Sequence, residues 1–194
     1  MLARAAAEPR ALIIGIDANA AGMAESSRRA YRGRSGHVAT NAIFLAEAAE
    51  GLPGSLAGTA SLVTITMPWG SLLHGVLGLD PVALRGVASV VAPYGRVEVL
   101  ASVLPADHVE GIEELDRSAG AAVARAWRRL GFELESMRPT TRDDLRSMRS
   151  SWARRLGDRP VWRIDLRRDG PAEAAARAGS AMWSASPDRD DHSA

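Results

Sequence analysis

The residues that most directly suggest chemistry lie at positions 67–71, Met-Pro-Trp-Gly-Ser, where an apolar run meets a proline and a tryptophan. The run itself, residues 61–67, is rich in β-branched side chains and predicts a strand. In open α/β sheets ligands bind beyond the carboxyl ends of the strands, so Trp69 would stand where a flat substrate can stack on it. The same pattern also fits a tryptophan that anchors a turn, and both interpretations stay open.

A second tryptophan, Trp152, follows two serines and precedes an alanine and two arginines in the segment 150–155, SSWARR. On a helix it would share one face with Leu145, Met148 and Leu156, which is typical of a core position. The two serines leave room for a local break that would release the indole from the core. Periodicity does not decide between these interpretations.

Carboxylates follow the first two predicted strands, residues 11–16 and 42–45. Asp17 ends the first strand, where an acidic residue in a doubly wound sheet can hydrogen-bond the ribose of a nucleotide cofactor. Asp is also favoured as a helix N-cap, so this position has two interpretations. Glu47 and Glu50 follow the second strand, and either one could accept a hydrogen bond from an adenine amino group or remain a solvated surface residue.

Several classes of chemistry lose support from the composition. The chain has no cysteine, and its four histidines are scattered without the spacing of metal ligands, so we expect no metal. There is no Walker-type phosphate loop, no complete GxGxxG and no Ser-His-Asp pattern. Hydrolases, kinases and metalloenzymes are therefore disfavoured.

The basic residues, 24 in number, are all arginine, although the net charge is only +1. A GC-rich genome would explain the absence of lysine, but arginine is also the better residue for bidentate phosphate contacts and for stacking on bases. The arginines concentrate in two clusters. These are Arg28, Arg29, Arg32 and Arg34, and Arg154, Arg155, Arg159, Arg163, Arg167 and Arg168.

The elements that must position these residues alternate between strand and helix, which predicts an α/β fold with a mainly parallel sheet. We expect one domain over residues 1–169 and a disordered tail over 170–194, where Ala, Gly, Ser, Asp and Pro dominate. No apolar run is long enough to span a membrane and no signal peptide is evident, so we expect a cytoplasmic protein. The strands are predicted at 11–16, 42–45, 61–67, 96–103, 132–137 and 161–166, and the helices at 20–31, 71–77, 82–91, 119–130 and from a Thr140/Asp143 capping box to Leu156.

Four motifs together carry a resemblance to a known family. The segments MPWGSLL at 67–73 and SSWARRL at 150–156, with GIDA at 15–18 and AAEGLP at 48–53, are similar to those of the kanamycin–apramycin resistance methyltransferases. The resemblance covers nearly everything from residue 1 to about residue 166. These enzymes methylate N1 of an adenine in the decoding site of small-subunit ribosomal RNA.

The resemblance implies a Rossmann-like class I methyltransferase sheet with an antiparallel edge and S-adenosylmethionine as cofactor. Asp17 would bind the cofactor ribose, and Ala49 and Glu50 would lie beside its adenine. Other residues would line its methionine end or the pocket around it. These are Thr66, Met67, Pro68, Trp69, Ser71, Ser150, Ser151 and Trp152.

The resemblance also implies how substrate is bound. Trp69 and Trp152 would sandwich the flipped target adenine, making them the catalytic pair. The partner would be the small ribosomal subunit, bound by a monomer of this chain. Its RNA phosphates would be bound by arginines of the two clusters, namely Arg28, Arg29, Arg155, Arg159 and Arg163.

In one respect the sequence departs from the family. Family members begin with a strand and a glycine-rich acidic loop, whereas Met1 here falls in what should be the helix after that loop. The absent strand would lie between the strands that end at Asp17 and Met67, so we expect a start assigned too far downstream or a truncated gene. Two alternatives follow, a non-catalytic RNA-binding remnant and an N-methyltransferase of a small molecule. The second tryptophan motif and the arginines that follow it argue against the latter.

Overall fold

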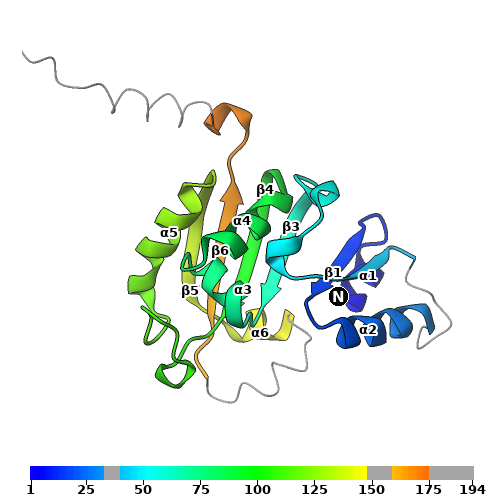
Figure 1. The fold of residues 1–194 in the computed structure, drawn as a ribbon, viewed down its shortest axis with the longest axis horizontal. Coiled ribbons are helices and arrows are strands. Elements are labelled where there is room, and N and C mark those ends of the chain that lie inside the picture. Colours follow the sequence, from blue (N-terminus) through cyan, green and yellow to red (C-terminus); the bar gives the residue numbers. More distant parts are fainter. Residues whose placement is uncertain (33–39, 148–158, 175–194) are drawn as a thin grey trace, which may run out of the picture. The chain divides into compact units, whose positions relative to one another are not determined.

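The computed structural model describes residues 1–32, 40–147 and 159–174. The contacts divide the chain into two compact units, Met1–Gly54 and Ser55–Ala194 (Figure 1), and the single domain expected over residues 1–169 stays a prediction. Each unit is therefore described by itself.

The first unit is a parallel pair of strands with two helices. Strand β1 (Ile13–Asp17) pairs in parallel with β2 (Ala42–Ala46), and helix α2 (Ala20–Arg32) packs on both strands. Helix α1 (Leu2–Ala7) precedes the sheet. Short apolar strands joined by a helix form this arrangement because a parallel pair requires a crossover connection.

The second unit is built on a mixed sheet of four strands in the order β3-β4-β6-β5. Strand β3 pairs in parallel with β4, whereas β6 runs antiparallel to both β4 and β5. The parallel pairs and the antiparallel edge confirm the predicted α/β class I sheet. Among the described residues, β1 and β3 each form an edge of their own sheet. The strands are β3 (Ala60–Thr66), β4 (Val91–Ala101), β5 (Phe132–Pro139) and β6 (Trp162–Arg168).

Helices cover one face of this sheet (Figure 1). They are α3 (Gly70–Val76), α4 (Pro81–Val90) and α5 (Gly120–Arg128), whereas α6 (Arg142–Ser147) follows β5. The Asp80 carboxylate caps α4 by accepting from the Val82 and Ala83 amides, with Pro81 at the first helical position. Four 3-10 turns complete the described part of the chain, at Ala49–Gly51, Gly54–Leu56, Pro105–Asp107 and Arg117–Ala119.

The core of the second unit lies between these helices and the sheet. Trp127 of α5 is fully buried, its indole nitrogen donates to the Val76 carbonyl at 2.9 Å, and its ring meets Phe132 edge-on at 5.0 Å. The apolar face of α5, with Val123 and Trp127 both 0% exposed, thus packs into the core. Every second residue of the central strands joins this core, namely Val97, Val99, Ile164 and Leu166, all 0% exposed.

Some boundary predictions are wrong in detail. The strand predicted at 96–103 begins at Val91 and ends at Ala101. The capping box before α6 is Thr141 with Asp144, one residue later than predicted, because the Thr141 amide donates to the Asp144 carboxylate at 2.7 Å and the Asp144 amide donates to the Thr141 hydroxyl at 3.2 Å. The first residues of the expected disordered tail are helical, because Gly170–Ala174 form a turn in which the Gly170 amide donates to Glu173 at 2.8 Å. The remainder of that tail lies outside the described residues.

Candidate functional site

The chain turns sharply where β3 ends. Met67 is buried to 7% exposure but has a φ of 51°, and its amide donates to the Leu100 carbonyl at 2.7 Å. The left-handed conformation costs an L-residue roughly 1–2 kcal/mol, and such strain is concentrated at functional sites. Gly70 also has a positive φ, 56°. Between them, at the N-cap of α3, Trp69 is 53% exposed.

An arginine lies over this tryptophan. The Arg159 guanidinium carbon is 5.9 Å from the centroid of the Trp69 ring, within the range of a cation–π contact. Its Nε donates to the Ser102 hydroxyl at 2.8 Å, and its Nη2 forms an ion pair with Asp107. The arginine is therefore held by two groups from the segment after β4 while its flat face lies near the indole.

The Asp107 carboxylate is itself fixed. It accepts from the Leu104 amide at 2.8 Å, so it closes the turn in which it lies. Burial raises the pKa of Asp107, but the Leu104 amide and the Arg159 guanidinium outweigh burial and hold the pKa below its ordinary value. Asp107 is therefore ionised at neutral pH and supplies a fixed negative charge to Arg159.

The strand register brings the connection between β5 and β6, residues 140–161, to the same end of the sheet. Ala101, near the carboxyl end of β4, lies opposite Trp162, the first residue of β6, and Trp162 lies opposite Pro139, the last residue of β5. The Thr140 amide donates to the Val161 carbonyl at 2.9 Å and ties the two ends of the connection together. The connection that contains Trp152 in sequence thus leaves the sheet at the same end at which β3 leads into the exposed Trp69.

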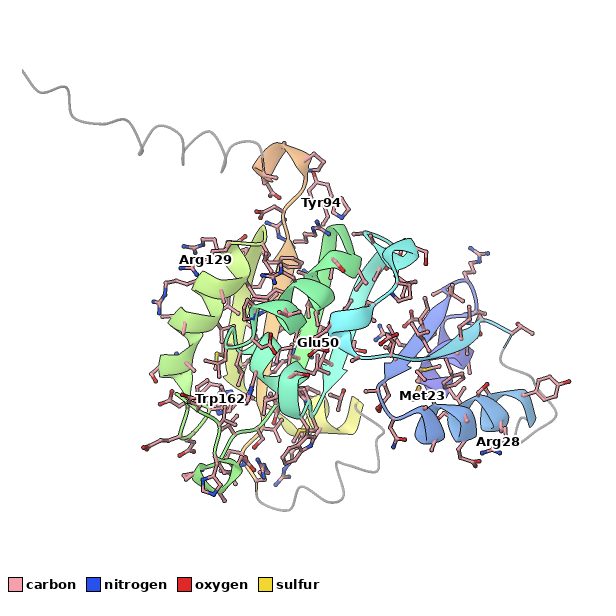
Figure 2. All side chains as sticks on the ribbon, viewed as in Figure 1. Met23, Arg28, Glu50, Tyr94, Arg129 and Trp162 are labelled. Carbon is pink, nitrogen blue, oxygen red and sulfur yellow. The ribbon has the colours of Figure 1, made fainter. Side chains whose placement is uncertain are left out.

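Several predicted residues cannot be placed. Ser150, Ser151, Trp152 and Arg155 lie outside the described residues, and so does the side chain of Arg29. Arg28 is exposed on α2 and pairs with Glu25 at 3.3 Å, one helical turn away (Figure 2).

In the first unit, the structure answers the question left open for Asp17. This exposed residue ends β1, and its carboxylate accepts from the Asn19 amide at 2.8 Å. The Asn19 side chain accepts from the Gly22 amide at 3.0 Å, so Asn19 rather than Asp17 caps α2. The interpretation of Asp17 as a helix cap is therefore wrong, and the ribose interpretation stays a prediction.

The predicted adenine-binding residues lie beside Asp17 within this unit. Asp17 is opposite Ala46 at the end of β2, and Ala49 and Glu50 form the short 3-10 turn that follows. Glu47 accepts from the Ala48 amide at 2.9 Å and so stabilises the backbone there, whereas Glu50 is exposed. The carboxyl ends of the two parallel strands thus present a carboxylate and a backbone turn side by side.

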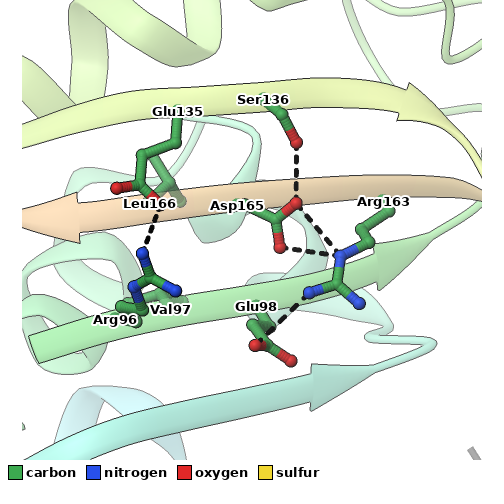
Figure 3. A pocket seen from close by; sticks show the side chains of 8 residues that line it. All are labelled: Arg96, Val97, Glu98, Glu135, Ser136, Arg163, Asp165 and Leu166. Carbon is green, nitrogen blue, oxygen red and sulfur yellow. Dashed lines mark hydrogen bonds and ion pairs between the residues drawn. The ribbon is translucent and has the colours of Figure 1, made fainter. Parts of the chain in front are cut away.

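Arg163 lies on the face of the four-stranded sheet that the helices α3, α4 and α5 leave open, here called the charged sheet face. Its guanidinium pairs with Asp165 at 2.8 Å and with Glu98 at 3.3 Å (Figure 3). It also pairs with Asp144 at 3.3 Å. These three carboxylates oppose a role in phosphate binding, which stays a prediction. The charged sheet face also carries Arg96, Glu135, Ser136 and Arg167, most of which line a pocket of about 220 Å³.

The described residues contain no group of His, Asp and Glu side chains that could hold a metal ion. No helix in this part of the chain is long and apolar enough to cross a membrane. Sequence reasoning found Trp69 and Arg159 but missed Asp107 and Ser102. These two lie 52 and 57 positions from Arg159, so no local pattern could have connected them.

The chain matches a protein-family model described as NpmA: 16S rRNA (adenine(1408)-N(1))-methyltransferase, over residues 1–161. A curated enzyme of that description from Streptoalloteichus hindustanus is 31% identical over 153 residues, covering 76% of this chain and 70% of the relative. Another, from Streptoalloteichus tenebrarius, is 33% identical over 154 residues with the same two shares.

Solved structures resemble the chain as well. A mutant of the 16S rRNA (adenine(1408)-N(1))-methyltransferase from Catenulisporales acidiphilia, solved with the cosubstrate SAM, has a TM-score of 0.76 and 28% identity, covering 88% of this chain and 80% of that one. The 16S rRNA methyltransferase KamB has a TM-score of 0.74 and 28% identity, with 87% and 81% covered.

Proposed function

The chain belongs to the NpmA family of 16S rRNA (adenine(1408)-N(1))-methyltransferases, and we propose that it methylates N1 of this decoding-site adenine in the small ribosomal subunit. The enzymes of this family use S-adenosylmethionine, and one structural relative was solved with that cosubstrate. The consequence of the modification would be aminoglycoside resistance, the role given to the relative NpmB1. The observation that carries the proposal is that Trp69 is half exposed at the strained end of β3, with the anchored Arg159 lying over its ring.

The residues present fit the cofactor by their chemistry. At the carboxyl ends of β1 and β2, the Asp17 carboxylate would accept from the ribose hydroxyls, and the turn at Ala49 and Glu50 would border the adenine. At the end of β3, residues 66–69 and Ser71 would border the methionine part. When bound, S-adenosylmethionine supplies a methyl group on a positively charged sulfur.

The target nitrogen explains which groups this chain needs. Adenine N1 carries a lone pair at neutral pH, so no side chain has to remove a proton before it attacks the methyl group. The protein must instead take the base out of its stack and hold N1 in line with the methyl group. Trp69 would stack on one face of the flipped base and Trp152 on the other. Such stacking contributes ~1–3 kcal/mol per base, and the aromatic faces also favour the cationic product.

Arginines would bind the RNA around this base. Arg159 lies over the Trp69 ring, and its anchoring by Asp107 and Ser102 holds a positive charge at the rim of the site. A phosphate flanking the flipped adenine would accept from the guanidinium groups that face it. Arg155 would act beside it, and Arg28 and Arg29 would bind a separate part of the RNA.

The proposal is tested by incubating purified chain with small ribosomal subunits and labelled S-adenosylmethionine, followed by primer extension across the decoding site. We expect label in 16S RNA and a block at adenine 1408. Trp69→Ala should lower kcat/KM by about 10- to 100-fold, the loss of one stacking partner. Cofactor affinity should change far less, and stability should hardly change because the side chain is half exposed. Label at another base, or a Trp69→Ala variant with wild-type kcat/KM, would contradict the proposal.

A further inference from the structure

We propose that Asp144 is a positioning residue for the ribosomal substrate, because it fixes the root of the β5–β6 connection at the end of the sheet where Trp69 stands. The inference rests on the proposed function, since it assigns that connection to substrate binding. It concerns only residues that the structure describes at the two ends of the connection.

The Asp144 carboxylate, on α6, accepts hydrogen bonds from three different residues. It is 9% exposed and accepts from both terminal nitrogens of Arg138, at 2.7 and 3.1 Å. It also accepts from Nη1 of Arg163 at 3.3 Å and from the amide and hydroxyl of Thr141 at 2.7 and 2.8 Å. One side chain of α6 is thus joined to β5, to β6 and to the residue that begins its own helix.

The bonds point to a carboxylate that stays charged. Hydrogen bonds from Arg138 are the largest influence and, against the effect of burial, hold the pKa of Asp144 well below its ordinary value. Buried ionic groups are a poor source of stability, because desolvation offsets most of their attraction. The two arginines instead fix the orientation of the carboxylate, because a planar guanidinium group donates to a carboxylate in few geometries.

Asp144 lies at the start of the β5–β6 connection, so its fixed orientation also fixes where that connection leaves the sheet. The Thr140–Val161 hydrogen bond closes the root of the connection, and Asp144 fixes the first helix that leaves it. The returning end is held separately, because Arg159 binds Ser102 and Asp107 beside Trp69. Both described ends of the connection are therefore held by arginine–carboxylate pairs, and by sequence the connection includes Trp152, which is predicted to contact the target base.

Arg163 acquires a role in this arrangement. It pairs with Asp144, and it also pairs with Glu98 of β4 and Asp165 of its own strand (Figure 3). Arg163 therefore connects Asp144 to two strands of the sheet. This accounts for an arginine in the second cluster that faces three carboxylates. Glu135 lies on the same face and pairs with Arg96 at 3.4 Å and with Arg167 at 3.6 Å rather than with the arginines that bind Asp144, which makes it a matched control.

The test compares Asp144→Asn with Glu135→Gln in the full chain. For Asp144→Asn we expect the KM for small subunits to rise about tenfold, with the KM for S-adenosylmethionine within about twofold of wild type. The dissociation constant for subunits, measured by sedimentation without cofactor, should rise by a similar factor. Asp144→Glu, which keeps the charge, should recover part of the loss, and Glu135→Gln should leave both constants unchanged.

A purely structural role would give a different result. Loss of folded protein lowers the apparent kcat in proportion to the active fraction, but leaves both KM values as they were. That outcome for Asp144→Asn, or an equal rise in subunit KM for Glu135→Gln, would overturn the inference. Arg163→Gln combined with Asp144→Asn should be less than additive, because the two side chains act as one unit.

The same measurements separate this inference from the proposed function. If wild type methylates the adenine and Asp144→Asn keeps the wild-type subunit KM and binding, the inference fails and the function stands. If wild type binds subunits without methylating them and Asp144→Asn weakens that binding, the function fails and the positioning role stands. If wild type neither binds nor methylates subunits, both fail.

Discussion

The two faces of the four-stranded sheet are made by the same strands but have opposite chemistry. On β6, Ile164 and Leu166 are fully buried beneath the helices, whereas Arg163, Asp165 and Arg167 alternate with them on the charged sheet face. On that face the arginines pair with carboxylates of neighbouring strands, so their charge is largely balanced. Arg159, outside the strand, instead lies over an aromatic ring at the rim of the site. The described arginines of one sequence cluster therefore lie in two different environments, and we predict that only Arg159 faces the substrate.

The largest effect should come from the apolar face. Leu166→Ala removes a fully buried side chain and should cost about 2–5 kcal/mol of unfolding free energy. Arg167→Ala, the next residue on the same strand, should change the urea midpoint only slightly, since exposed ion pairs contribute little. Equal losses for the two variants would mean that the two faces do not differ as described.

The division of the arginines makes a second prediction, of intermediate size. Arg159→Ala should weaken subunit binding and lower the slope of log Kd against log salt by about one, as expected for a lost phosphate contact. Arg167→Ala should leave the slope unchanged, because three carboxylates balance its charge, Glu133 at 3.1 Å, Glu173 at 3.2 Å and Glu135 at 3.6 Å, whereas Arg159 pairs with Asp107 and also lies over Trp69. Titrations of subunits at several salt concentrations measure both slopes. A reduced slope for Arg167→Ala alone would reverse the assignment.

The smallest effect is expected from pH. Because the pKa of Asp144 is depressed in the folded chain, its stabilising contribution is present above the unfolded value of about 3.9 and is lost as pH falls below it. The difference in Tm between wild type and Asp144→Asn should therefore be constant from pH 7 to 5 and shrink below about pH 4. A difference that shrinks already between pH 7 and 6 would show that another group is responsible.

The sequence allowed the strands to be predicted well because their signals are local. Alternation placed β5 and β6, and a β-branched run followed by Pro68 placed the end of β3 and hence Trp69. Charge pairing across strands gave no such signal. Nothing near Arg163 in sequence shows that Glu98 lies opposite, since the pair depends on the register of β4 with β6.

The helix caps and the strained backbone at Met67 could not be predicted from the sequence pattern either, because they also depend on the folded structure. Thr140 with Asp143 and Thr141 with Asp144 satisfy the same spacing rule, and the choice depends on which carboxylate meets Arg138. The assignment of Asp17 as a cap failed because Asn19, two residues later, also suits that role. At Met67 the residue type itself points away from a left-handed conformation.

The left-handed backbone at Met67 also sets a rule for how this site can change over evolutionary time. Valine, isoleucine and threonine, which would suit the strand just before it, are the residues that tolerate a φ of 51° least. Glycine would adopt the conformation freely but would give up the buried side chain. Sequence drift at position 67 should therefore be confined to unbranched or aromatic side chains, even where neighbouring strand positions exchange β-branched residues freely.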